Sequence, residues 1–291
     1  MLRHDAALAR GEDALVNWPR IAFQGGSRPS GGGARTTRSQ SDVMPSHSIS
    51  AFIDDVSPRL ISRLRPLILS SRMTTPDPAS WARALSGPVT FQGDAHGKLA
   101  RLARPGHPVV QVGDLGAGFV SAKDFRENVS EREDFRFIRG NHDDPAICRK
   151  DPRYLGDWGG GGAMFWVSGA WSIDRAWRVE GRVWWPDEEL DAAQMRDAFD
   201  AYAEARPRLM ITHEGPSCLF AAGGPMQIRG YESSATASLL QAMLDLHRPE
   251  AWIFGHHHVS RDFYLKKTRF RCLAELETLK VEFDGAGSFS W

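Results

Sequence analysis

The chain of 291 residues has few cysteines, no excess charge of either sign and no long apolar run. Its three cysteines, Cys148, Cys218 and Cys272, are too widely spaced for a disulfide framework or a cysteine zinc site, which predicts reduced thiols in a cytoplasmic protein. No apolar run approaches the roughly 20 residues that a transmembrane helix needs, and no secretory signal pattern begins the chain. Equal numbers of basic and acidic residues, 36 each, do not indicate nucleic-acid binding.

Lysine is missing from the first part of the chain, where Lys98 is the first to occur. Residues 1–80 contain ten arginines and stretches rich in glycine and serine. Such a composition buries too little apolar surface to offset chain entropy, so we expect disorder there. The alternative is an extension created by a translation start placed too far upstream, with Met73 as the true start. Residues 81–291 are expected to form one globular domain.

From residue 88 onward, short apolar runs alternate with segments of helical character. Strands are predicted at 89–91, 109–112, 135–138, 209–212 and 252–254. Helices are predicted at 97–104, 121–132, 187–205 and 233–247, and closing strands within 270–283. Strand, helix and strand at this spacing indicate βαβ units, and hence an α/β fold.

Each of the five predicted strands is followed by aspartate, asparagine or histidine. These residues are Asp94, His96, Asp114, Asn141, His213, His256 and His258. Because the carboxyl ends of neighbouring strands in an open α/β sheet form one crevice, we expect the seven side chains to meet there. An extended chain at 94–96 and 256–258 would point alternate residues the same way and turn His257 away.

Imidazole combined with carboxylate and amide oxygens suits Mn, Fe, Zn or Co better than Ca. Seven such groups exceed the usual four ligands of one tetrahedral ion, but they suffice for two ions if one carboxylate bridges them. Asp114, the lone acid of its motif, is the candidate bridge. Two divalent ions, with Mn expected first, would clamp the oxygens of a phosphoryl displacement and activate a water molecule.

The ordered motifs resemble the signature of the calcineurin-like metallophosphoesterases over residues 88–283. They read Asp94-x-His96, Gly113-Asp114, Gly140-Asn141-His142-Asp143, His213 and Gly255-His256-x-His258. The resemblance implies a sandwich of two sheets flanked by helices (αββα). It implies a first metal held by Asp94, His96, Asp114 and His258, and a second held by Asp114, Asn141, His213 and His256.

The same resemblance implies roles for the two residues after Asn141. His142 would stabilise or protonate the leaving oxygen, and Asp143 would orient the ring of His142. A histidine beside two cations can donate to a developing alkoxide, and a neighbouring carboxylate can fix its tautomer. The alternative for Asp143 is a capping role at a helix that starts near Pro145.

The motifs leave several phosphorylated substrates open. A phosphomonoester or a phosphodiester is the first expectation, and a nucleotide or dinucleoside polyphosphate hydrolase or a protein phosphatase is the alternative. The protein phosphatases of the family carry Asp-Arg-Gly shortly after the second motif, where residues 115–118 read Leu-Gly-Ala-Gly, so this alternative is weakened. A non-enzymatic alternative is a metal-stabilised scaffold that binds a partner through the tryptophan-rich segment, residues 158–185.

Six of the ten tryptophans lie in this segment, beside a glycine run, 159–162, expected to be a flexible loop. The tryptophans are expected to pack under an inserted hairpin, with a wall that stacks on a substrate ring as the alternative. Arg139 is the candidate for binding substrate phosphate, because a guanidinium can hold phosphate through two parallel hydrogen bonds. Further candidates are Arg175, Arg178 and Arg182.

Overall fold

The computed structural model describes residues 77–291. The expectations of disorder or a misplaced start for residues 1–80 fall almost entirely outside this described part. Within it, no helix has the length and apolar character needed to cross a membrane.

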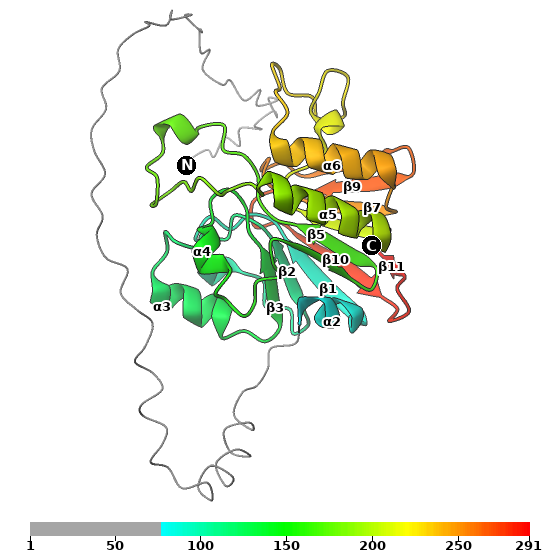
Figure 1. Cartoon of the computed structure of the whole chain (residues 1–291). Helices are drawn as coiled ribbons and strands as arrows, with labels where there is room; N and C mark the ends of the chain where they lie inside the picture. The colour runs from blue at the N-terminus through cyan, green and yellow to red at the C-terminus, as the bar shows by residue number, and fades with distance from the viewer. Residues whose placement is uncertain (1–76) are drawn as a thin grey trace, which may run out of the picture. The chain divides into compact units, whose positions relative to one another are not determined.

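Two mixed sheets lie at the centre of the described part (Figure 1). The first sheet runs in the order β11 (Phe289–Ser290), β10 (Thr278–Phe283), β1 (Gly87–Gln92), β2 (Val109–Val112) and β3 (Phe135–Ile138). The second runs in the order β4 (Trp158–Gly161), β5 (Met164–Val167), β6 (Leu209–Thr212), β7 (Ala251–Phe254), β9 (Thr268–Cys272) and β8 (Arg261–Leu265). The strands β1, β2 and β3 are parallel, and so are β5, β6, β7 and β9.

Short helices accompany the first sheet and longer ones the second. The former are η2 (Leu99–Arg101), α3 (Ala122–Phe125), the π-helical turn η3 (Arg126–Ser130) and α4 (Pro145–Cys148). The latter are α5 (Ala192–Ala205) and α6 (Ala235–Leu246). The helix α2 (Pro78–Arg83) has six residues, and η4 (Arg175–Trp177) and η5 (Ser217–Leu219) are single turns. The helix α5 begins with a reciprocal capping box between Asp191 and Gln194, which satisfies backbone N–H groups of its first turn.

Three apolar clusters divide the described part into four layers. The central cluster joins the inner faces of the sheets and includes Val89, Val110, Ile211 and Ile253. A second cluster lies between the outer face of the second sheet and α5 and α6, and a third lies between the outer face of the first sheet and α3. The predicted αββα sandwich is therefore confirmed.

The predicted strands are divided between the two sheets, with β1, β2 and β3 in one and β6 and β7 in the other. The structure corrects one detail of the predicted elements. The glycine run expected to be a flexible loop is the edge strand β4, paired antiparallel with β5. Here α2 packs directly on the strand, since a Cβ at Gly161 would lie 2.2 Å from the carbonyl oxygen of Ala79.

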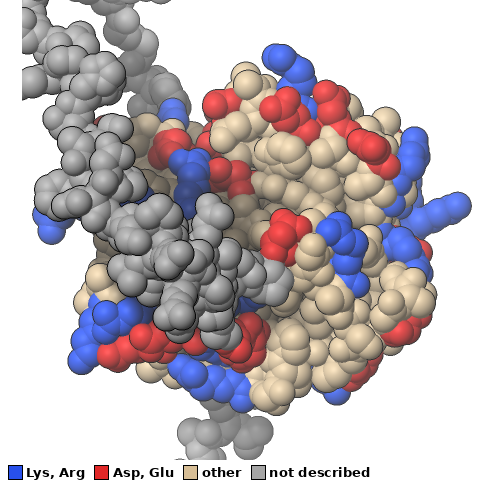
Figure 2. All heavy atoms as spheres, turned by 60° about the horizontal axis from the view of Figure 1, so that its bottom comes forward, with Lys and Arg blue, Asp and Glu red and all other residues tan. Residues whose placement is uncertain are grey.

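Both acidic and basic side chains appear on the face that Figure 2 shows, with broad uncharged areas between them. This distribution agrees with the balanced composition of the chain, 36 basic against 36 acidic residues.

Candidate metal centre

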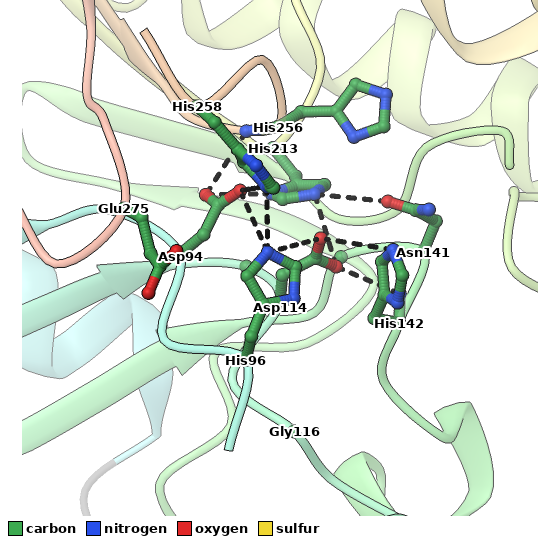
Figure 3. A network of polar contacts seen from close by, with 12 residues as sticks. Asp94, His96, Asp114, Gly116, Asn141, His142, His213, His256, His258 and Glu275 are labelled. Atoms are coloured by element: carbon green, nitrogen blue, oxygen red, sulfur yellow. Dashed lines mark hydrogen bonds and ion pairs between the residues drawn. The ribbon is translucent and has the colours of Figure 1, made fainter. Parts of the chain in front are cut away.

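The seven predicted ligands lie together at the carboxyl ends of strands from both sheets. Asp94 follows β1, Asp114 follows β2 and Asn141 follows β3, all in the first sheet. His213 follows β6 and His256 follows β7 in the second sheet. Figure 3 shows the side chains of Asp94, His96, Asp114, His213 and His258 directed toward a common centre.

The first group contains Asp94, His96, Asp114 and His258, each with one ligand atom within 4.8 Å of the others. The Nε2 atoms of His96 and His258 lie 2.8 Å apart, and His258 Nε2 lies 3.2 Å from Asp94 Oδ2. Asp94 Oδ2 is buried and has no hydrogen-bond partner within residues 77–291. A buried carboxylate oxygen without a donor, facing imidazole nitrogens, is a suitable place for a cation.

The second group contains Asp114, His213 and His256, again within 4.8 Å of one another. His213 Nε2 lies 3.3 Å from Asp114 Oδ1 and 3.3 Å from the side-chain oxygen of Asn141. Asp114 thus belongs to both groups, as a bridging carboxylate must. The donor set fits two divalent ions of the kind that imidazole and carboxylate oxygens prefer.

The backbone at these residues is left-handed rather than extended. Positive φ angles occur at His96 (44°), Asp114 (56°), His256 (68°) and His258 (54°). The expected alternation along an extended chain is therefore wrong. His257 lies on the ring of Phe220 with centroids 4.1 Å apart. Left-handed backbone is unfavourable for residues other than glycine. Four non-glycine residues in this conformation within one cluster therefore indicate a functional site.

A glycine makes room for the shared carboxylate. A Cβ at Gly140 would lie 2.1 Å from Asp114 Oδ1, so no larger residue fits at this position without moving Asp114. The Gly140 of the third motif thus has a steric reason to precede Asn141.

Buried groups behind the cluster orient two of the candidate ligands. His213 Nδ1 contacts the carbonyl oxygen of Val112 at 2.8 Å, which leaves Nε2 for the centre. The side-chain amide of Asn141 donates to Ser172 Oγ (2.9 Å), and Ser172 donates to Glu188 (2.5 Å). This chain directs the oxygen of Asn141 toward the centre. No sequence signal marks Ser172 or Glu188, because both come from a loop far along the chain.

Glu214 is a further buried group that sequence reasoning missed. Its carboxylate accepts from His257 Nε2 at 2.9 Å, and it lies 3.6 Å from His256 Nε2. The two histidines and Glu214 form a third histidine–carboxylate group beside the second one. Glu214 directly follows the predicted ligand His213 in the sequence, but an acidic residue after a histidine is too common to indicate a functional role.

Charges within the cluster shift the pKa values of its members in opposite directions. Burial works to raise the pKa of Asp114, but His213, His142 and His96 hold it well below its usual range. Burial would lower the pKa of His213, whereas the charge and hydrogen bond of Asp114 raise it to about 10. Burial prevails at His256 and lowers its pKa to about 4. A cation that binds here must displace the proton of His213, so binding is coupled to proton release.

His142 lies at the rim of the cluster. Its Nε2 is 3.9 Å from Asp114 Oδ2, and its side chain is 24% exposed, so it faces both the candidate metal ligands and solvent. Arg178 contacts the ring, with Nη1 2.6 Å from Nδ1 and Nη2 2.9 Å from Nε2. Burial and the charge of Arg178 lower the pKa of His142, against the opposing effect of Asp114.

Asp143 does not occupy the predicted position beside the His142 ring. Its buried carboxylate accepts four backbone hydrogen bonds, from the N–H groups of Leu115, Gly116, Ala117 and Gly140. Burial and the charge of Asp114 raise its pKa, while these N–H groups oppose the shift. Nor is Asp143 the helix cap of the alternative, since Asp144 caps α4. Asp143 joins the second and third motif loops, which corrects the expected orienting role.

Replacing Asp143 by alanine should therefore destabilise the fold by about 2–4 kcal/mol, because four buried N–H groups lose their acceptor. Thermal unfolding of the purified variant measures this. The matched control is Asp144→Ala, which removes only the cap of α4 and should cost about 1 kcal/mol. A loss of catalytic rate with unchanged unfolding temperature would restore the orienting role to Asp143.

The structure also corrects the placement of Arg139. Its side chain has no exposed surface and forms an ion pair with Asp157 at 2.9 Å. It also donates to the carbonyl oxygen of Glu188. An arginine buried in this way supports the loop that carries Glu188, and it does not reach a substrate in solvent.

The expected packing of the tryptophans holds for part of the segment. Trp166 and Trp185 are buried, and Trp166 belongs to the core between the sheets. Trp158, Trp171 and Trp184 are half-buried, and Trp177 is 70% exposed. The alternative, an aromatic wall that stacks on a substrate ring, stays a prediction.

Two sheets packed face to face, with histidines and carboxylates gathered at their strand ends, define the class of the metallophosphoesterases. The sequence profile of the calcineurin-like phosphoesterases matches residues 87–260. The chain belongs to this family, and it is a hydrolase that acts on phosphate esters. Members of the family typically use divalent metal ions, for which the two groups supply candidate ligands.

Several solved structures align with the chain at low identity. A conserved uncharacterized protein from Streptococcus pneumoniae, described as a predicted phosphoesterase, aligns with a TM-score of 0.32 and 13% identity over 68% of this chain and 83% of its own. The phosphopantetheinyl hydrolase from Mycobacterium tuberculosis aligns with a TM-score of 0.38 and 14% identity over 66% of this chain and 91% of its own. A putative 5'-nucleotidase from Staphylococcus aureus aligns with a TM-score of 0.41 and 14% identity over 70% of this chain and 52% of its own. No curated protein matches the chain in sequence.

Proposed function

We propose that the chain hydrolyses a phosphomonoester or phosphodiester at a centre of two divalent ions, with Mn as the first choice. The ligands of one ion would be Asp94, His96, Asp114 and His258, and those of the other Asp114, Asn141, His213 and His256. The observation that carries this proposal is the membership of Asp114 in both groups. One carboxylate shared between two sets of ligand atoms is what a dinuclear centre requires.

When bound, the divalent ions supply positive charge for the phosphate oxygens and acidify a water molecule near neutral pH. The residues of the chain hold the candidate metal ligands in position. Asp114 is held by its hydrogen bond from the His142 N–H (2.9 Å), and Asn141 by Ser172. His142 is next to the cluster and reaches solvent, so it is placed to donate a proton to the oxygen that leaves with the alcohol.

Hydrolysis of p-nitrophenyl phosphate and of its bis ester tests this function directly. The Mn-loaded full chain should turn over at least one of the two esters. Removal of the metal with a chelator should lower the rate at least about 10³-fold, and added Mn should restore it. A rate that survives complete removal of metal contradicts the two-metal centre. No turnover of either ester with metal bound would favour the metal-stabilised scaffold.

A wider panel addresses the alternatives of a nucleotide or dinucleoside polyphosphate hydrolase and a protein phosphatase. Nucleotides, dinucleoside polyphosphates and phosphopeptides are compared at equal concentration with the aryl esters. A preference of at least about 100-fold in kcat/KM, or roughly 3 kcal/mol in transition-state binding, identifies the substrate class.

A further inference from the structure

We propose that Arg178 binds the phosphate group of the substrate and makes the site selective for phosphomonoesters over phosphodiesters. The inference rests on the proposed phosphoesterase function and narrows it. The supporting observations are the hydrogen-bond partners of the five N–H groups of Arg178 and the position of its guanidinium beside His142.

Arg178 belongs to the segment 168–191, which joins β5 to α5 and contacts the site at two points. Ser172 of this loop holds Asn141, and Arg178 contacts His142. The side chain of Arg178 is 15% exposed, so it is partly enclosed yet open to a ligand. A single loop thus touches a candidate metal ligand and the candidate proton donor that follows it in the chain.

Three of the five N–H groups of Arg178 are occupied by oxygen atoms of the protein. Nε donates to Asp174 Oδ1 (2.6 Å) and Nη2 donates to Asp174 Oδ2 (2.8 Å). Nη1 donates to the carbonyl oxygen of Val183 (3.1 Å). A guanidinium has one N–H on Nε and two on each Nη, so one N–H remains on each Nη. These two form a fork, and both face the ring of His142.

His142 cannot satisfy this fork. A neutral imidazole accepts at one nitrogen only, and an imidazolium accepts at neither. At least one N–H of the fork therefore lacks an acceptor, whichever tautomer His142 adopts. Asp174 fixes the guanidinium on its other edge, so the fork is rigid and its charge is only partly exposed. Two parallel donors in a rigid plane match two oxygens of one phosphate group, which would bind the fork in place of the His142 ring that faces it in this structure.

The number of phosphate oxygens decides between the two ester classes. A phosphomonoester has three oxygens that carry no alcohol group. Two of them can accept from the fork, and the third remains for the candidate metal ligands nearby. A phosphodiester has only two such oxygens and carries less charge, so it cannot occupy the fork and the metal centre in the same way.

The other candidate arginines do not offer the same arrangement. The guanidinium of Arg175 lies over the ring of Trp171, 5.1 Å from its centroid. Arg139 is buried against Asp157, and Arg182 is exposed. Arg182 is therefore a suitable control, because it lies in the same loop and carries the same charge.

The experiment compares Arg178→Met, Arg178→Lys and the control Arg182→Met in the Mn-loaded full chain. Metal content and unfolding temperature are measured first, and both should equal those of the unchanged protein. Calorimetry with inorganic phosphate then measures anion binding, and kcat/KM is determined for p-nitrophenyl phosphate and its bis ester. Arg178→Met should weaken phosphate binding at least about 10-fold and lower kcat/KM for the monoester about 100-fold, mainly through KM.

The bis ester should change less than about threefold, and Arg182→Met should change neither ester. Arg178→Lys keeps the charge but loses the fork, so about a 10-fold loss on the monoester is expected. Equal losses on both esters, or phosphate binding unchanged in Arg178→Met, overturn the role of Arg178. If the unchanged protein hydrolyses neither ester, the proposed function fails, while phosphate binding still tests Arg178 by itself.

Discussion

Replacing Asp114 by asparagine should lower the rate of phosphate ester hydrolysis at least about 10³-fold and reduce bound metal below two ions per chain. Asp114 is the residue shared by the two candidate ligand groups, and it is 1% exposed. Asparagine keeps the shape of the side chain but removes the charge and one of the two oxygen ligands. The loss therefore reports on the bridge rather than on packing.

Metal analysis and turnover of p-nitrophenyl phosphate, measured on the same sample, check this expectation. The matched control is Glu275→Gln, which removes one negative charge beside the site but outside both ligand groups (Figure 3). Its rate should stay within about threefold of the unchanged protein. If Asp114→Asn retains two ions and an unchanged rate, Asp114 is not a bridge.

Replacing His142 by alanine should lower the rate by about 10²-fold or more while the metal content stays the same. His142 is not a member of either candidate ligand group, yet its ring lies 5.0 Å from that of His96. The loss should depend on the leaving group. An alkyl phosphate needs a proton on its leaving oxygen far more than p-nitrophenyl phosphate does, so its rate should fall further.

The control for this prediction is His107→Ala, because His107 contacts Thr90 on the first sheet and not the cluster. Its rate should not change. Equal losses for the alkyl and the aryl ester would show that His142 does not donate the proton, and an unchanged rate would remove it from the mechanism.

The strands and the cluster were predictable from local sequence. Short runs of Val, Ile and Phe mark β1, β2, β3, β6 and β7, because each of these strands is buried on both faces. The candidate ligands follow these runs directly, and the rule that parallel strands end at one edge brings together the ligands that come from the same sheet. Five ordered motifs therefore carried most of the information about the site.

The two-sheet sandwich was predicted through the resemblance to the family, and the surroundings of the cluster were not predictable from local sequence. A run of glycines has no periodicity, so β4 is recognised only through its pairing with β5 and its contact with α2. The roles of Asp143 and Arg178 depend on contacts with residues 26 to 36 positions away along the chain. Pairwise contacts at such separations leave no pattern in a single sequence.

The candidate ligands are divided between the sheets. The first sheet supplies Asp94, Asp114 and Asn141, and the second supplies His213 and His256. Any cation that binds there would link two layers that are also joined by apolar contacts and by hydrogen bonds such as that between His213 and the carbonyl oxygen of Val112. A fragment with one sheet would hold only part of a coordination sphere. Metal affinity would therefore report on the docking of the two layers, and a slip of one layer past the other would empty the site before either layer unfolds.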